Sequence, residues 1–240
     1  MKMRALATTI ILAFALCGCS HGSGILHVPD ATASSNSSQD VASAIEELSS
    51  IEIAEDDGSE YNSDIRKSSY GGWEDVSGWS TRDVVLSQTA EDATKTSSAF
   101  TSGVWVSPYT GEEIVCSTKE EVSKNIQIDH IIPIGYVHRH GGASWSDDKK
   151  KEYYNDYGTI DANYDSGDNG TVDYPKIGVL VAVDSKSNIS KSDKGPSEWM
   201  PSDKSYWVEY CIKWVEIADA YDISLSKADY DKIQEVLENA

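Results

Sequence analysis

The chain has 240 residues, of which 39% are hydrophobic and 25% are charged, with 40 Asp and Glu against 20 Lys and Arg. The net charge of −20 argues against a protein that holds polyanions over a broad basic surface, because phosphate contacts require Lys and Arg. Beyond the first residues, no segment approaches the ~20 apolar residues of a spanning helix, which excludes an integral membrane protein.

The N-terminus has the layout of an export signal. Lys2 and Arg4 precede an apolar run over residues 5–15, and Cys17-Gly18-Cys19 then resembles the end of a lipobox. We expect residues 1–18 to be a lipoprotein signal peptide and Cys19 to carry the lipid, which anchors the protein to a membrane at the cell surface. The alternative is an ordinary secretory signal cleaved nearby, because Cys17 is unusual two places before a modified cysteine.

Residues 19–69 have the composition of a tether. They are rich in Ser, Asp and Glu, with Arg66 and Lys67 as the only bases between residues 20 and 69. This composition predicts a disordered acidic segment that is dispensable for activity. Val41, Ile45 and Leu48 have helical spacing, which allows a short amphipathic helix within it.

Aromatic density rises at Tyr70, so residues 70–240 are predicted to form one globular domain. Caps, turns and hydrophobic spacing give the expected elements of this domain. In chain order these are a helix that starts at Thr81, a hairpin of residues 103–106 and 114–116, a strand over residues 126–132, a helix that starts at Ser146, a strand over residues 177–183, a short helix over residues 184–191, a helix over residues 206–221 and a last helix from Ser226. The mixture predicts an α+β fold.

Cys116 and Cys211 remain as an even pair once Cys17 leaves with the signal and Cys19 is lipidated. In an oxidising compartment, the simplest expectation is a disulfide between the hairpin and the long C-terminal helix. Such a long loop gives a chain-entropy gain of roughly 4–5 kcal/mol. The alternative is two separately buried thiols.

The segment with chemistry begins at Asp129-His130, at the end of a β-prone run that Pro133 terminates. An adjacent carboxylate and imidazole offer one metal ligand and one general base. A strand over residues 179–183 and a helix over residues 184–191 place Asn188 and Lys191 over this pair. The alternative for His130 is a structural histidine bonded to a neighbouring strand. His138 and His140 lie in a polar stretch and are expected at the surface.

Three further segments carry a resemblance to a known family. They are Gly-Gly-Ala-Ser-Trp at 141–145, Asn155-Asp156, and Ser-Asn-Ile-Ser-Lys-Ser-Asp-Lys-Gly-Pro-Ser-Glu-Trp-Met-Pro at 187–201. Together with Asp129-His130, they resemble the secreted HNH endonucleases related to the C-terminal domain of GmrSD-type restriction endonucleases. The resemblance covers about residues 79–221. It implies a ββα-metal (HNH, His-Me finger) core with an N-terminal β-hairpin and C-terminal helices.

The resemblance also implies roles for individual residues. His130 would be the general base, Asp129 a metal ligand, and Asn188 the residue that closes the metal site and takes part in catalysis. Lys191 and Lys194 would lie beside the scissile phosphate, Lys191 as a catalytic and substrate-binding residue. The implied cofactor is one divalent ion, with Mg²⁺ expected and Mn²⁺, Ni²⁺ and Zn²⁺ as alternatives.

The implied activity is metal-dependent hydrolysis of phosphodiester bonds in DNA or RNA outside the cytoplasm, with nucleic acid as substrate and no protein partner. The net charge predicts modest affinity for nucleic acid. Two other functions remain open, namely a metal-dependent cell-wall hydrolase and a non-catalytic cell-surface binding lipoprotein on the same fold.

The sequence departs from the family pattern in two places. Val179 stands where the second strand usually opens with Asn, so the residue that orients the base is missing or is supplied from elsewhere, for instance by Asn155. An insertion over about residues 157–176 carries Asp and Asn oxygens that hint at calcium. Ser166 stands where an EF-hand requires Gly, so a solvated loop is favoured.

Overall fold

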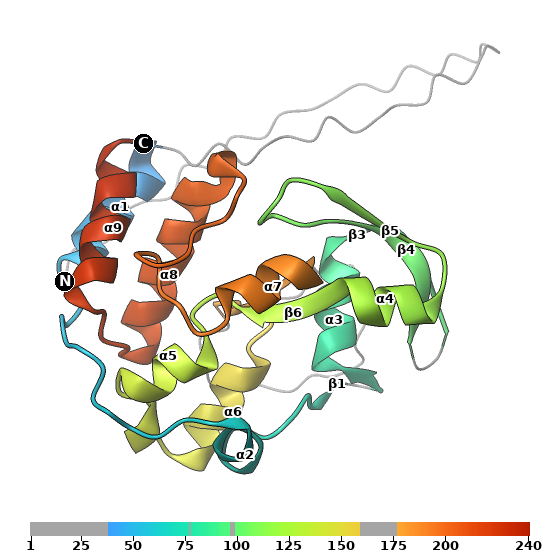
Figure 1. Ribbon diagram of the computed structural model, residues 1–240, viewed down its shortest axis with the longest axis horizontal. Coiled ribbons are helices and arrows are strands. Elements are labelled where there is room, and N and C mark those ends of the chain that lie inside the picture. Colours follow the sequence, from blue (N-terminus) through green and yellow to red (C-terminus); the bar gives the residue numbers. More distant parts are fainter. Residues whose placement is uncertain (1–37, 77, 97–98, 159–176) are drawn as a thin grey trace, which may run out of the picture. The chain divides into compact units, whose positions relative to one another are not determined.

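The computed structural model describes residues 38–76, 78–96, 99–158 and 177–240 (Figure 1). The expected signal peptide, Cys19 and nearly all of the insertion lie outside these residues. The secondary structure comprises α1 (Ser38–Leu48), α2 (Ser63–Ile65), the π-helical turn η1 (Arg66–Tyr70), β1 (Asp75–Val76), β2 (Trp79–Ser80), α3 (Thr81–Thr89), β3 (Ala90–Lys95), β4 (Phe100–Val106), β5 (Glu113–Cys116), α4 (Lys119–Asn125), β6 (Ile126–His130), α5 (Ile134–Arg139), the 3₁₀ turn η2 (Gly142–Ser144), α6 (Asp147–Asn155), β7 (Leu180–Asp184), α7 (Ser185–Lys191), the 3₁₀ turn η3 (Lys204–Tyr206), α8 (Trp207–Tyr221) and α9 (Lys227–Glu238).

The fold is α+β, as the sequence predicts, with small antiparallel sheets among helices. β3, β4 and β5 form one sheet in that order, and β1 pairs with β2. β6 and β7 form a separate antiparallel pair whose register runs from Ile126 opposite Asp184 to His130 opposite Leu180. Among the described helices, none is long and apolar enough to cross a membrane.

A strand–strand–helix unit is centred on β6. α7 follows β7 without a loop, because the side chain of Asp184 caps the helix by accepting from the backbone N of Ser187 at 2.9 Å. α7 packs against both β6 and β7. The last residues of β6 and of α7 are therefore brought together.

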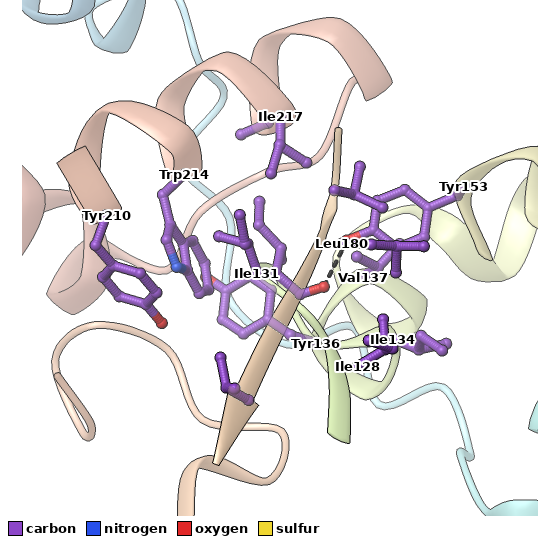
Figure 2. Packing of buried hydrophobic residues seen from close by; sticks show 14 of the residues in the cluster. Ile128, Ile131, Ile134, Tyr136, Val137, Tyr153, Leu180, Tyr210, Trp214 and Ile217 are labelled. Atoms are coloured by element: carbon purple, nitrogen blue, oxygen red, sulfur yellow. Dashed lines mark hydrogen bonds between the residues drawn. The ribbon is translucent and has the colours of Figure 1, made fainter. Parts of the chain in front are cut away.

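The main core lies between α8 and the β6–β7 pair (Figure 2). Tyr210, Trp214 and Ile217 project from α8 toward Ile131 and Leu180. All five side chains are buried. Burial of large apolar side chains is the main stabilising contribution to such a layer.

The N-terminal segment corrects the expected tether. α1 packs on α8 and α9, with Ala44 and Leu48 on its buried face, and Ile53 pairs with Leu225 as an isolated parallel bridge. Residues 38–69 are thus part of the folded unit, and the predicted domain start at Tyr70 is wrong. The amphipathic spacing becomes core because α8 and α9 supply an apolar surface to cover it.

The expected disulfide is also wrong, because Cys116 and Cys211 are free thiols that are buried separately. Cys116 ends β5, which packs on α4, whereas Cys211 lies in α8, which packs on α1 and α9. Figure 1 shows β5 and α8 well apart. A disulfide requires Cα atoms within about 7 Å of each other. Burial raises the pKa of Cys211 to about 12, so this thiol is unreactive.

The histidines expected at the surface are buried as well. His138 is 7% exposed and contacts the Tyr70 hydroxyl through Nδ1 at 3.2 Å. His140 is 5% exposed, and its ring is stacked on Tyr136 with centroids 4.0 Å apart. His138 therefore joins α5 to η1, whereas His140, the C-cap of α5, stacks back on a residue of the same helix.

Candidate functional site

A pocket of about 340 Å³ opens at the end of β6. Asp129 and His130, the last two residues of β6, both line it, and so does Asn188 from α7. The structure therefore brings together three of the residues that the sequence singles out. Each meets a different set of neighbours.

Asp129 is enclosed by protein donors. Its Oδ2 accepts a hydrogen bond from the Tyr109 hydroxyl at 2.6 Å and lies 2.7 Å from Nζ of Lys191. The same Nζ donates to the backbone carbonyl of His130 at 2.8 Å. Burial raises the pKa of the Asp129 carboxyl, an effect that the charge of Lys191 opposes, and burial lowers the pKa of Lys191. The Asp129 carboxylate and the Lys191 ammonium thus form a buried ion pair, to which the Tyr109 hydroxyl and the His130 carbonyl add hydrogen bonds.

The expectation that Lys191 lies beside the scissile phosphate is wrong for this structure. Its side chain has an exposed fraction of 0%, and both of its contacts are with β6. Lys191 ends α7, whose packing on β6 directs the long side chain inward. Lys194 is not among the residues that line the pocket, and its Nζ donates to the carbonyl of Ser190 at 2.9 Å.

His130 has one nitrogen bonded and one open. Its Nε2 lies 3.1 Å from the backbone carbonyl of Tyr154, and a carbonyl can only accept, so Nε2 carries the proton. Nδ1 therefore has a free lone pair, and no described residue bonds to it. Burial lowers the pKa of His130 to about 3, which keeps the imidazole neutral. The free Nδ1 is the position at which a proton would add, and the lowered pKa makes this imidazole a weaker base than an exposed histidine.

The orientation of His130 comes from Tyr154 rather than from Asn155. The side chain of Asn155 instead bonds Thr81 at 2.7 Å and the backbone N of Glu74 at 2.9 Å. Val179 is buried, and its backbone carbonyl accepts from Ile131 N at 2.8 Å, so it extends the β6–β7 pairing. A backbone acceptor carries no side-chain signal, which is why the sequence does not reveal it.

Asn188 presents an oxygen to the pocket. Its Nδ2 donates to Oε1 of Gln127 at 2.8 Å, and no described residue bonds to its Oδ1. The hydrogen bond to Gln127 orients the amide so that its acceptor is the free end. Asp129, Asn188 and Asp193 are the pocket residues with carboxylate or amide oxygens, and Asp193 is already paired with Arg139, which leaves Asp129 and Asn188 as the candidates for a cation.

This donor set fits a hard cation. Within the described part of the chain, no three His, Cys, Asp or Glu side chains cluster as metal ligands. Mg²⁺ keeps several waters and needs only one or two protein oxygens, which Asp129 and Asn188 offer, whereas zinc sites generally use three or four protein ligands. The residues present therefore fit Mg²⁺ better than Zn²⁺.

Three further residues that line the pocket, Tyr61, Arg66 and Trp73, were not singled out from the sequence, and the first two lie in the segment assigned to the tether. Arg66 begins η1 and donates from Nη1 to the Tyr154 hydroxyl at 2.8 Å. The one signal was that Arg66 and Lys67 are the only bases in an otherwise acidic stretch.

Comparison with known proteins adds one relative. No family model and no solved structure matches the chain. An "Uncharacterized secreted protein" of Arthroderma benhamiae (strain ATCC MYA-4681 / CBS 112371) is 29% identical over 167 residues, which is 69% of this chain and 70% of that protein. The description of the relative names no reaction, so a functional argument must come from the site itself.

Proposed function

We propose that the chain is a metal-dependent endonuclease that hydrolyses phosphodiester bonds of DNA or RNA outside the cytoplasm, on an HNH-type ββα-metal core. The observation that carries the proposal is the state of His130, a neutral imidazole held at Nε2 and open at Nδ1, in a pocket at the end of β6. The antiparallel β6–β7 pair followed by α7 supports the proposed core.

In the proposed reaction, Nδ1 of His130 takes a proton from a water molecule as the water oxygen bonds to phosphorus. The bond from phosphorus to the 3′ oxygen breaks, and that oxygen takes a proton from solvent. The carbonyl of Tyr154 stabilises the imidazolium that forms, because its hydrogen bond to Nε2–H strengthens when the ring becomes charged.

Asp129 and Asn188 are the residues that would hold the divalent ion, with Mg²⁺ as the expected ion. When bound, the ion would offset negative charge that develops on the phosphate. Lys191 would be a positioning residue without contact to substrate, because it bonds both the Asp129 carboxylate and the His130 carbonyl. Because Lys191 is fully buried, it has no contact with the phosphate in this reaction, unlike the role that the family resemblance implies.

The secretion of the fungal relative supports a location outside the cytoplasm. Lipid attachment at Cys19 would then place the enzyme on a membrane surface, and a secreted form would result if the lipobox is not used. Nucleic acid is the proposed substrate, and the proposal includes no protein partner.

The test is plasmid nicking by the purified protein with Mg²⁺, Mn²⁺ or Ni²⁺, and with EDTA. We expect nicking that EDTA abolishes, and a loss of roughly 10²- to 10⁴-fold in His130→Ala, because the general base is removed. Lys124→Ala, at an exposed position on α4, is the control for an unrelated substitution. Wild-type nicking rates in His130→Ala would contradict the proposed base.

Two other outcomes identify the competing functions. Nucleic-acid binding without cleavage under any of the three ions would favour the non-catalytic binding lipoprotein. Release of peptide or glycan fragments from cell walls, with no nicking, would favour the cell-wall hydrolase.

A further inference from the structure

One residue that lines the pocket is a cation with no acidic partner among the described residues. Arg66 lines the pocket and donates to the Tyr154 hydroxyl, and its Cζ lies 5.9 Å from the centroid of the Tyr154 ring. It forms no ion pair with any carboxylate of the described residues, whereas Arg139 pairs with both Asp56 and Asp193. The two carboxylates that line the same pocket, Asp129 and Asp193, are paired with Lys191 and Arg139 instead, so the charge of Arg66 is available for an anion.

Two aromatic residues, Trp73 and Tyr154, line the pocket together with Arg66. The ring of Trp73 lies 4.8 Å from that of Tyr154 between centroids, and its plane is within 8° of the His130 ring at 6.0 Å. Trp73 is half-buried and lines the pocket, so part of its surface is open to a ligand. Tyr154 is buried, so Trp73 is the ring of the two that a ligand can reach, and a cation beside such a ring is the combination that binds a backbone phosphate together with a stacked base.

The size and charge of the site favour an unpaired nucleotide over a duplex. A pocket of about 340 Å³ lies at the small end of the usual range of roughly 300–1,000 Å³ for ligand sites. Bases within a duplex are stacked on one another and do not reach into such a pocket. The net charge of −20 also deprives the protein of the many phosphate contacts that hold duplex DNA.

We infer that Arg66, Trp73 and Tyr154 form a subsite for the nucleotide next to the scissile phosphate, and that the substrate is single-stranded or locally unpaired nucleic acid. Arg66 binds the phosphate of that nucleotide, Trp73 stacks on its base, and the buried Tyr154 holds Arg66 in place through its hydroxyl. This inference rests on the proposed function, since it assigns the substrate class of the same pocket.

The first experiment measures binding of a fluorescein-labelled 12-nucleotide oligothymidine, and of a 12-base-pair duplex, by fluorescence anisotropy. The protein carries His130→Ala so that the probe is not cut. We expect the single strand to bind at least about tenfold more tightly than the duplex, because only its bases can stack on Trp73. Equal affinity for both probes, or no binding of either, overturns the inference.

Variants of Arg66 test the phosphate contact. Arg66→Gln removes the charge while keeping a donor for the Tyr154 hydroxyl, so the fold is retained. It is expected to weaken single-strand binding about tenfold and to lower the slope of log K against log salt by about 0.7. Arg66→Lys restores the charge and should recover the slope. Lys124→Gln, which removes one exposed charge on α4, should change neither quantity.

Variants of Trp73 test the stacking contact separately. Trp73→Ala should weaken single-strand binding about tenfold with an unchanged salt slope, because an uncharged contact releases no counterions. Trp73→Phe should keep most of the affinity, and circular dichroism checks that each variant is folded. An unchanged affinity in both Arg66→Gln and Trp73→Ala overturns the inference.

Failure of this inference and failure of the proposed function give different results. A protein that nicks plasmid but whose Arg66→Gln form binds oligothymidine normally refutes the subsite alone. A protein that binds oligothymidine through Arg66 and Trp73 but cuts nothing with any of the three ions refutes the proposed reaction and keeps the subsite.

Discussion

The surroundings of Asp129 and of His130, at the end of β6, differ in whether the polar atoms there are satisfied within the protein. On the closed side, Oδ2 of Asp129 accepts hydrogen bonds from the Tyr109 hydroxyl and from a fully buried lysine, Lys191, so a metal ion would have to bind the other oxygen, Oδ1. On the other side, His130 has an Nδ1 that no described residue contacts, in a pocket that also contains an arginine, Arg66, without an acidic partner. Buried polar groups are normally satisfied within the protein, so the side left unsatisfied is the one prepared for a ligand.

The closed side explains how the open side is held in place. Lys191, at the end of α7, bonds the side chain of Asp129 and the main chain of His130, so one cation joins helix and strand just behind the imidazole. An imidazole positioned in this way needs no protein contact at Nδ1, the nitrogen proposed as the base. The open side can therefore remain empty until a ligand arrives.

The largest expected effect comes from removing the segment that completes the open side. A chain that starts at Tyr70 lacks Arg66 and also α1, which covers α8 and α9. Each buried side chain of the Leu48 type contributes about 1.5–3 kcal/mol, and the whole stability of a domain is only about 5–15 kcal/mol. We expect this fragment to lose cooperative thermal unfolding by circular dichroism.

A chain that starts at Ser38 is the control for that truncation, and it should melt like the full protein. A fragment from Tyr70 that unfolds at the same temperature would show that the N-terminal segment is a tether after all.

The next effect is on the closed side. Lys191→Met leaves the Asp129 carboxylate buried without its cation, and the free energy of unfolding should fall by about 3–5 kcal/mol in urea titrations. The double variant Asp129→Asn with Lys191→Met should be more stable than the single variant, because no buried charge is left unpaired. Lys186→Met, at an exposed position on the same helix, should change stability by less than about 0.5 kcal/mol.

Wild-type stability of Lys191→Met would mean that the cluster around Asp129 is not the support described here. It would also remove the contrast between a closed side and an open side.

The smallest expected effect is the contribution of His140 to the loss of folding stability in acid. Burial lowers the pKa of His140, against the opposing charges of Asp56 and Asp229, with Arg139 adding to the lowering and Asp57 opposing it. A depressed folded-state pKa means that the unfolded chain binds the extra proton first. Stability is therefore fully present above about pH 6.5, the unfolded value, and is lost as the pH falls toward the folded value.

Urea unfolding between pH 7.5 and pH 5 measures this loss for the wild type and for His140→Gln. The variant should show a flatter pH dependence, because it lacks the His140 imidazole, while His130 and His138, whose pKa values burial also lowers, keep the rest of the acid sensitivity. An identical slope in both proteins would assign the acid sensitivity to other groups.

Sequence by itself determined the local elements and part of the site. The ends of β7 and α7, the hairpin of β4 and β5, and the C-terminal helices follow from caps, turns and hydrophobic spacing, all of which operate within a few residues of one another. The sequence pairing of Asp129 with His130, and the short helix that bears Asn188, likewise led to three residues that line one pocket.

Tertiary structure alone decided the burial of Lys191, the Tyr154 carbonyl that orients His130, the arrival of Arg66 at the pocket, and the separation of Cys116 from Cys211. Each of these depends on which distant element lies opposite, and no local pattern encodes that. An amphipathic segment stays solvated in water but forms part of the core when a partner helix covers its apolar face. A lysine likewise stays at the surface unless a buried carboxylate and a carbonyl accept hydrogen bonds from its ammonium group.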